Sequence, residues 1–155
     1  DGTAITDTLH LYVRDEKSTA TAGGSSVAGT QVRTLNTVVT NTITGASLAS
    51  NLITLPAGTY EILARAPAAG ATNGSQASLY NNTDASTIII GSSSAPGDVV
   101  SLADSWVAGR FTLAATKDVK INHFTQSVQA TFGLGRPSGS GLTEVFTEVQ
   151  IWKVA

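Results

Sequence analysis

Apolar and polar residues alternate along most of this chain, and the pattern is clearest in residues 51–68. A short apolar run over Leu52–Leu55 ends at a Pro-Ala-Gly turn, and a second segment begins at Thr59. In that second segment every other residue is apolar or aromatic, whereas the residues between them include two opposite charges. Period-two alternation of this kind is typical of a strand with one buried face. The pattern therefore predicts two strands joined by a tight turn.

The two faces of this second strand differ in character. The face predicted to be buried carries Tyr60, Ile62, Ala64 and Ala66, and the opposite face carries Glu61, Leu63 and Arg65. A face with an apolar residue between two opposite charges is neither plain solvent surface nor plain core. It indicates contact with another chain.

The same alternation recurs along the rest of the sequence. Further strands are predicted at Leu9–Arg14, Trp106–Leu113, Val119–Thr125 and Glu144–Val154, and a hairpin at residues 77–90 around Asn-Thr-Asp. Charged residues make up only 13% of the chain, which disfavours surface helices. Many short strands separated by Gly, Ser, Thr and Asn predict an all-β sandwich or barrel in a single domain of 155 residues.

Composition excludes several classes of function. The nine basic residues are scattered singly and the net charge is −2, so no basic stripe exists to bind nucleic acid. No apolar run approaches the roughly 18 residues of a membrane helix, so membrane insertion is not expected. The chain has no cysteine, and it therefore has no disulfide, thiolate metal site or thiol nucleophile.

The sequence also contains no recognisable catalytic motif. There is no G-x-S-x-G turn, the serine run at residues 92–94 lacks a neighbouring base, and no carboxylate pair stands out. His10 and His123 lack metal-ligand spacing and are expected to be structural or solvent-facing. We therefore expect no enzyme, no cofactor and no metal. A metal on a three-fold axis, held by one residue per chain, leaves no motif and stays open.

The order of the motifs resembles the C1q/tumour-necrosis-factor-like jelly rolls, in particular those at the C-terminal tips of bacteriophage tail fibres. The resemblance covers about Leu9 to the C-terminus and rests on segments 33–36 (RTLN), 53–60 (ITLPAGTY), 66–68 (APA), 78–84 (SLYNNTD), 109–112 (GRFT) and 144–153. Phage versions often carry a His where this chain has Ser75. The resemblance implies a ten-strand jelly-roll sandwich that forms a homotrimer, with residues 1–8 leading in from an upstream fibre shaft.

The resemblance also implies which residues form the trimer interface. In such trimers the first, last, third and sixth main strands form an inner sheet whose outward face packs near the axis. The implied interface residues are His10, Tyr12, Glu61, Leu63, Arg65, Lys120, Asn122, Phe124, Phe146, Glu148, Gln150 and Trp152.

Simpler alternatives stay open for part of this interface. Phe146 and Trp152 are also compatible with packing under a loop of their own chain. Arg65 is placed to meet Glu61 or Glu148 of another chain, or these residues are ordinary surface charges.

The function implied by the resemblance is a receptor-binding tip of a tail fibre. It would attach the virion to a polysaccharide or outer-membrane protein of a bacterial host, acting at the virion surface and outside the cell. Candidate receptor contacts lie in two polar loops: Tyr80, Asn81, Asn82, Asp84, Arg136, Ser138 and Ser140. Turn chemistry alone accounts equally well for Asn82 and Asp84. The alternatives are a trimerisation cap or capsid decoration, and an accessory domain of a depolymerase.

Overall fold

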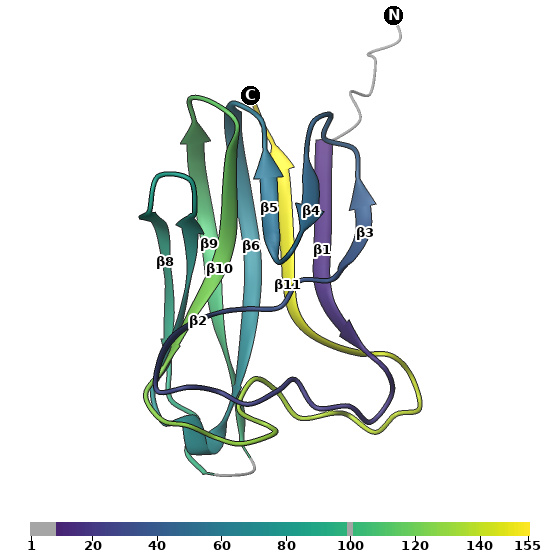
Figure 1. The fold of residues 1–155 in the computed structure, drawn as a ribbon, viewed down its shortest axis with the longest axis vertical. Helices are drawn as coiled ribbons and strands as arrows, with labels where there is room; N and C mark the ends of the chain where they lie inside the picture. Colours follow the sequence, from purple (N-terminus) through teal and green to yellow (C-terminus); the bar gives the residue numbers. More distant parts are fainter. Residues whose placement is uncertain (1–8, 99–100) are drawn as a thin grey trace, which may run out of the picture.

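The computed structural model describes residues 9–98 and 101–155, and the expected lead-in over residues 1–8 lies outside them. This described chain forms a β-sandwich of eleven strands with one short 3-10 turn, η1 (Figure 1). In chain order the elements are β1 (Leu9–Lys17), β2 (Gly29–Val32), β3 (Thr37–Asn41), β4 (Ser47–Ala49), β5 (Leu52–Leu55), β6 (Gly58–Ala69), η1 (Gly70–Thr72), β7 (Ser75–Asn81), β8 (Ser86–Ser94), β9 (Leu102–Leu113), β10 (Lys117–Thr125) and β11 (Glu144–Lys153).

The strands form two antiparallel sheets that face each other. The five-strand sheet has the order β3-β1-β11-β6-β9, and the six-strand sheet has the order β4-β5-β10-β7-β8 with β2 also paired to β10. The chain changes sheet at every connection except β4–β5 and β7–β8, as in a jelly roll. The expected all-β jelly-roll sandwich is thus confirmed. One more strand is described than expected, because residues 29–41 supply a short strand to each sheet.

The core lies between the inward faces of the two sheets. It contains Leu11, Val13, Ile53, Leu55, Tyr60, Ile62, Leu79, Val107, Val119, Ile121, Val149 and Ile151, each at most 3% exposed. The alternation predicted for β6 is confirmed, since Tyr60, Ile62, Ala64 and Ala66 are all buried. Burial of these apolar side chains supplies most of the favourable free energy of folding.

The Pro-Ala-Gly turn between β5 and β6 is held by its neighbours. The Tyr60 hydroxyl donates to the Pro56 carbonyl oxygen at 2.7 Å, and the Tyr60 ring stacks on Phe111 at 5.4 Å between centroids. A Cβ at Gly58 would lie 2.9 Å from the backbone oxygen of Ala155, so glycine allows the end of the chain to pass this closely. The turn therefore fixes the start of β6 against the end of β11.

One cation lies fully inside the sandwich. Arg33 is 1% exposed, and its guanidinium donates to Thr147 Oγ1 at 2.7 Å and to the carbonyl oxygens of Pro67 and Leu134 at 2.9 and 2.8 Å. Burial lowers the pKa of Arg33 to about 10. Arg33 therefore joins β11, the end of β6 and the long loop before β11.

His123 lies beside this guanidinium and is itself fully buried. Its Nδ1 is 3.3 Å from Nη1 of Arg33. A guanidinium can only donate, so Nδ1 accepts and the imidazole is neutral with its proton on Nε2. Burial, together with the Arg33 charge, lowers the pKa of His123 to about 3. The expectation that His123 is structural is therefore confirmed.

Long loops gather at one end of the sandwich and short turns at the other (Figure 1). The segments 18–28 and 126–143 cross the lower end in that view and bond to each other, for example from Gly23 N to Gly135 O at 2.9 Å. Glu144 fastens both loops, because its carboxylate accepts from the backbone N–H groups of Ala20, Ser138 and Gly139. The hydrogen bond from Ser138 is the main reason that the pKa of Glu144 is lowered.

Candidate functional site: an outward sheet face

The candidate site is the outward face of the five-strand sheet, which we call the assembly face. Its side chains come from four neighbouring strands: His10 and Tyr12 of β1, Glu148, Gln150 and Trp152 of β11, Glu61, Leu63 and Arg65 of β6, and Trp106 and Arg110 of β9. The strand register places these residues in rows. Gln150 lies opposite both Tyr12 and Leu63, and Trp152 lies opposite both His10 and Glu61. The rows make one continuous surface across the sheet.

Aromatic rings stack at one end of this face. His10 and Trp152 have centroids 5.0 Å apart with planes inclined by 9°, and His10 and Tyr12 have centroids 6.4 Å apart. Stacked rings of this kind restrict each other's rotation while leaving their outer faces available. This end of the face is therefore preformed.

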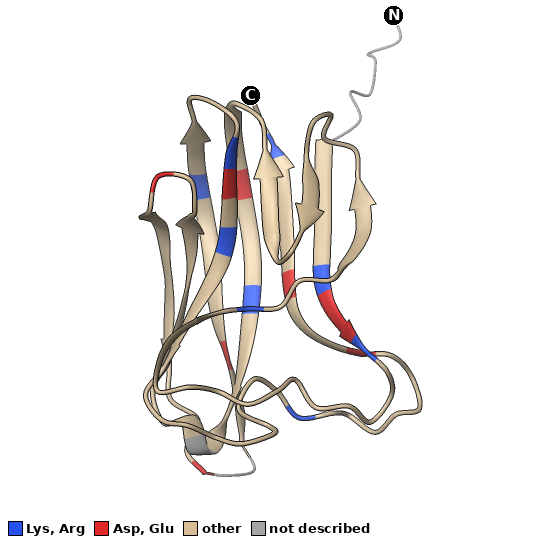
Figure 2. Cartoon of the chain, in the orientation of Figure 1, with Lys and Arg blue, Asp and Glu red and all other residues tan. Residues whose placement is uncertain are grey.

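Charged side chains in the middle of the face are paired within the chain. Acidic and basic residues are interspersed along β1, β6 and β11 (Figure 2). Glu148 accepts from the Tyr12 hydroxyl and from Arg65 Nε, which is 2.5 Å away, and Arg65 Nη1 lies 3.4 Å from Asp104. Arg110 Nε lies 2.7 Å from Glu61. Arg65 thus pairs with Glu148 of its own chain, and a pairing of Arg65 with a second chain stays a prediction.

These contacts shift the acidities of the groups involved. Partial burial acts to raise the pKa of Glu148, but the hydrogen bonds from Tyr12 and Arg65 outweigh it and lower that pKa. Burial and the hydrogen bond to Glu148 raise the pKa of Tyr12. Both groups therefore keep their usual charge at neutral pH. Pairs this exposed stabilise the fold by at most about 1 kcal/mol.

The apolar part of the assembly face is open to solvent. Leu63 is 40% exposed and Trp106 is 46% exposed, and both line a hollow of about 180 Å³ together with Arg65, Glu148 and Gln150. Trp106 was absent from the interface expected from the sequence. It occupies this face because β9, and not β10, pairs with β6 along its whole length.

Three predicted interface residues lie elsewhere, which is a correction. Lys120, Asn122 and Phe124 are on β10, in the middle of the six-strand sheet, and they point to the opposite side of the sandwich from the assembly face. The expectation that their strand belongs to the inner sheet was wrong. The alternation along β10 was correct, since Val119 and Ile121 are fully buried.

Phe146 is also displaced from the predicted surface. It is 3% exposed, and a Cβ placed on Gly135 would lie 2.3 Å from its Cδ1. Gly135 has φ +137°, a conformation that favours glycine. The loop before β11 therefore covers Phe146, and the simpler alternative of packing within the same chain is correct for this residue.

The two predicted receptor loops lie at opposite ends of the sandwich (Figure 1). At the β7–β8 turn, Asn81 is 5% exposed, and its side chain bonds to both the carboxylate and the backbone N–H of Asp84. Asp84 also pairs with Lys117 at 2.6 Å. Asn81 is therefore a turn-forming residue and not an exposed contact, which corrects its assignment.

The other hairpin residues are more accessible. Lys120 donates to Asn82 Oδ1 at 2.7 Å and lies 5.2 Å from the centre of the Tyr80 ring. These contacts order the outer surface of the hairpin. They place Tyr80 and Asn82 together at one end of the molecule.

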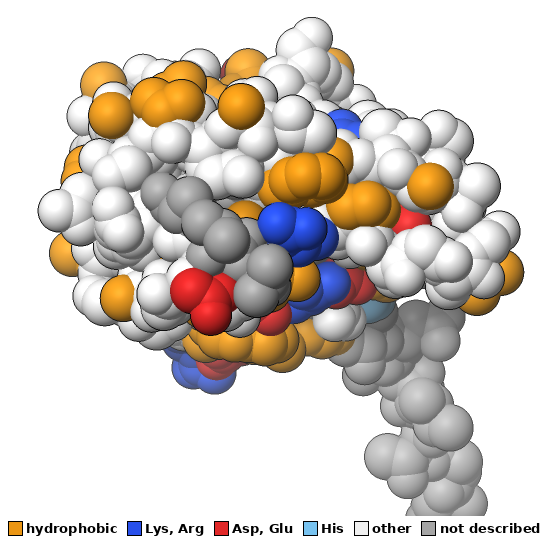
Figure 3. Space-filling model, turned by 90° about the horizontal axis from the view of Figure 1, so that it is seen from below, with side chains coloured by type: hydrophobic (Ala, Val, Ile, Leu, Met, Phe, Trp, Pro, Cys, Tyr) orange, Lys and Arg blue, Asp and Glu red, His pale blue; other side chains and the backbone are white. Residues whose placement is uncertain are grey.

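The second loop lies at the other end. Arg136 stacks over Phe132 at 4.4 Å, and the Ser138 hydroxyl donates to Ser140 Oγ at 3.1 Å. Seen from this end, the surface consists mostly of backbone and neutral polar side chains (Figure 3). The structure does not bring Arg136, Ser138 and Ser140 near the β7–β8 turn of the same chain.

Across residues 9–98 and 101–155, no three His, Cys, Asp or Glu side chains are grouped so that they could hold a metal ion. None of the helical segments described in the structure is long and apolar enough to cross a membrane.

Comparison with known proteins identifies the fold. No family model and no curated protein matches the sequence. Solved structures do match: murine APRIL at pH 5.0 has a TM-score of 0.63 at 12% identity, covering 96% of this chain and 100% of that one. The globular domain of zebrafish complement 1qA gives 0.59 at 14% identity, covering 96% and 98%. Eiger TNF from S. frugiperda gives 0.61 at 12%, covering 96% and 93%. The described chain therefore has the C1q/TNF-like jelly-roll fold.

Proposed function

We propose that this chain is a non-enzymatic attachment domain that acts as a homotrimer at the tip of a phage tail fibre. It would bind a polysaccharide or protein on the bacterial surface, and would work on the virion outside the cell. The observation that carries the proposal is the assembly face, where exposed Leu63 and Trp106 lie between charges that are already paired. Trimeric assembly is typical of the C1q/TNF-like fold, and this supports self-association.

The electrostatics of the assembly face suit contact with a second copy. Burying an unpaired charge is costly, whereas burying a pair that already shares hydrogen bonds costs much less. Arg65 and Glu148 are such a pair, and the Tyr12 hydroxyl satisfies a second oxygen of Glu148. An apolar centre with aromatic residues around it is also typical of stable protein interfaces.

The affinity of a trimer for the bacterial surface would increase because its binding site is repeated three times. Three identical weak sites held at fixed spacing bind a repetitive surface much more tightly than one site, without any new contact. Polysaccharides and arrays of membrane proteins are repetitive in this sense. The proposed function thus needs only modest affinity at each site.

A structural role is the second candidate, and one observation favours it. The polar groups of the predicted receptor loops are largely used within the chain, as in the bonds between Asn81 and Asp84 and between Glu144 and the backbone of Ser138. Loops whose polar groups are hydrogen-bonded within the chain suit a trimerisation cap or a capsid decoration as well as a binding tip.

Two measurements test the proposal. Light scattering of the purified chain is expected to give three times the monomer mass of 15.8 kDa, and a monomer would contradict the assembly. The purified trimer is then added to host bacteria before phage. Blocked adsorption supports an attachment domain, whereas a trimer that never reduces adsorption supports the structural cap.

A further inference from the structure

A continuous uncharged surface lies on the outward face of the six-strand sheet, on the opposite side of the sandwich from the assembly face. Phe124 of β10 lies opposite Thr30 of β2 and Gln76 of β7, and Gln76 lies opposite Ser93 of β8. The next outward row, in the same strand order, contains Val32, Asn122, Ser78 and Ile90. We call these two rows the outer platform.

Two hollows open on the outer platform. One has a volume of about 350 Å³ and the other about 200 Å³, and both use Gln76 and Phe124 as walls. Phe124 is 44% exposed and Ile90 is 70% exposed, so apolar surface faces the solvent here. Ligand sites in proteins commonly measure about 300–1,000 Å³ and combine apolar walls with a few polar groups. The larger hollow reaches this size.

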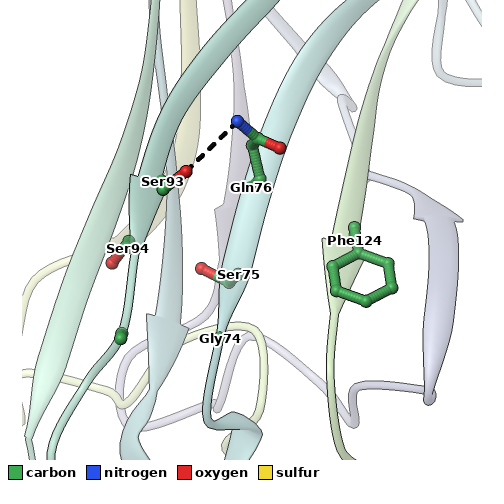
Figure 4. Close-up of a pocket in the computed structure, with 7 residues that line it drawn as sticks. Gly74, Ser75, Gln76, Ser93, Ser94 and Phe124 are labelled. Atoms are coloured by element: carbon green, nitrogen blue, oxygen red, sulfur yellow. Dashed lines mark hydrogen bonds between the residues drawn. The ribbon is translucent and has the colours of Figure 1, made fainter.

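Two serines at the edge of the larger hollow have buried hydroxyl groups without partners in the described chain. Ser75 is 4% exposed, and its Oγ has no hydrogen-bond partner in the described chain. Ser94 lies opposite Ser75 on β8, and its Oγ is also buried and unpaired there. Figure 4 shows both serines on neighbouring strands beside Gln76. Ser75 shares the core-facing side of β7 with Ala77 and Leu79, so these two hydroxyls lie behind the platform and the outward polar groups carry the argument.

Further hydrogen-bonding groups point outward from the platform. Gln76 Nε2 donates to the Gly91 carbonyl oxygen at 3.0 Å and to Ser93 Oγ at 3.3 Å, as drawn in Figure 4 for Ser93. This fixes the amide and leaves its Oε1 free to accept. The side chains of Asn122 and Ser78 form no side-chain hydrogen bond within the described residues. The platform thus offers neutral donors and acceptors around one aromatic ring.

This combination selects one ligand chemistry. No residue that lines either hollow is charged, so a phosphate or an acidic peptide would find no counter-charge. A purely apolar ligand would leave the outward polar groups of Asn122 and Ser78 without hydrogen-bond partners. A pyranose ring has an apolar face that can pack on Phe124 and hydroxyls that can bond to amide and serine groups.

We propose that the outer platform binds neutral hexopyranose units of a bacterial surface polysaccharide. The proposal rests on the proposed function and deepens it, because it names the binding site and the class of ligand. The platform would stay open in a trimer assembled through the five-strand sheet. Three platforms would then face outward, one from each chain.

An oligosaccharide array tests this proposal, with neutral and acidic fragments of bacterial surface polysaccharides as probes. Binding of the purified full chain is measured for the native protein, Phe124→Ala and Asn122→Ala. Val38→Ala is the matched control, because Val38 is 46% exposed on the other sheet. Neutral fragments are expected to bind. Phe124→Ala is expected to weaken that binding at least tenfold and Asn122→Ala several-fold, while Val38→Ala leaves it unchanged.

The outcomes separate this proposal from the proposed function. A native chain that binds no neutral fragment overturns the platform proposal, and so does equal binding by native chain, Phe124→Ala and Asn122→Ala. If Phe124→Ala and Asn122→Ala block phage adsorption to the same extent as the native chain, the proposed attachment function stands and the platform proposal is wrong. If the native chain neither binds glycans nor blocks adsorption, both proposals fail. Circular dichroism and light scattering confirm that each variant remains folded and assembled.

Discussion

Replacement of the buried Arg33 is expected to lower the stability of the fold. Its guanidinium supplies the donors for Thr147 Oγ1 and for the buried carbonyl oxygens of Pro67 and Leu134. Arg33→Met leaves these acceptors unpaired, so the free energy of unfolding should fall by about 2–4 kcal/mol. Urea denaturation measures the loss.

Arg110→Met provides the control for this experiment. The Arg110 side chain is 66% exposed and pairs with Glu61, so its loss should change stability by less than about 1 kcal/mol. Similar unfolding midpoints for the two variants would show that the buried hydrogen bonds of Arg33 add little.

His123 makes stability depend on pH in the acid range. Its pKa is about 3 in the folded chain, against about 6.5 in an unfolded one. The unfolded state therefore binds more protons between these values, and stability falls as the pH is lowered from about 6.5 towards 3. The slope due to this residue approaches roughly 1.4 kcal/mol per pH unit.

The contribution of His123 can be isolated by substitution. His123→Gln retains an acceptor for Arg33 but does not titrate, so its unfolding midpoint in urea should depend less steeply on pH between 6.5 and 4.5. Carboxylates such as Glu148 titrate mainly below this range and are common to both proteins. Parallel pH profiles for the native chain and the variant would refute the assignment.

The sequence contained part of the signal for Arg33. Arg33 and Leu35 are two residues apart, and both are buried, so alternation places the cation on the core side. Strand periodicity identifies the side of the sheet that Arg33 faces, but it does not identify the hydrogen-bond acceptors of the guanidinium. Those acceptors come from residues 67, 134 and 147, which are distant in sequence and are brought together only by the fold.

At the scale of strands, alternation predicted faces well but did not predict neighbours. The buried and exposed sides of β6 and β10 were correct, because period-two patterning is a local property of the chain. Which strand pairs with β6 is decided by long-range hydrogen bonding, and β9 takes the place expected for β10. Loop coverage is equally non-local, which is why Phe146 is buried under Gly135.

A pair of aromatic substitutions tests this exchange of strands. Trp106 lies on the assembly face and Phe124 on the opposite side of the sandwich, and the two are similarly exposed at 46% and 44%. Trp106→Ala should weaken trimerisation at least tenfold, because it removes large aromatic area from the interface. Phe124→Ala should leave trimerisation unchanged.

Analytical ultracentrifugation of the two variants over a range of concentrations provides the comparison. The native chain sets the reference dissociation constant. Loss of assembly in Phe124→Ala, with Trp106→Ala intact, would restore β10 to the interface and show that the structure assigns the face to the wrong strand.

At the scale of the whole molecule, the two proposed roles, assembly and ligand binding, lie on different sheets. The five-strand sheet presents paired charges, stacked rings and an apolar centre, which suit contact with identical chains. The six-strand sheet presents an uncharged platform with open polar groups, which suits a carbohydrate. The hydrophobic core between them couples the two surfaces rigidly, so assembly would set the spacing of the three platforms.

Leu63→Asp tests assembly at the centre of this arrangement. Leu63 is 40% exposed in the single chain and lies opposite Gln150 and Ala108. An aspartate is therefore tolerated by the monomer, but in a trimer it would be buried beside Arg65, whose charge is already paired with Glu148 and Asp104. The dissociation constant of the trimer is expected to rise at least 100-fold. Because assembly stabilises the folded state by mass action, the Tm of the native chain should increase with concentration and that of Leu63→Asp should not. Val128→Asp, at a loop position 64% exposed, should behave like the native chain, and a Leu63→Asp trimer would show that another surface holds the copies together.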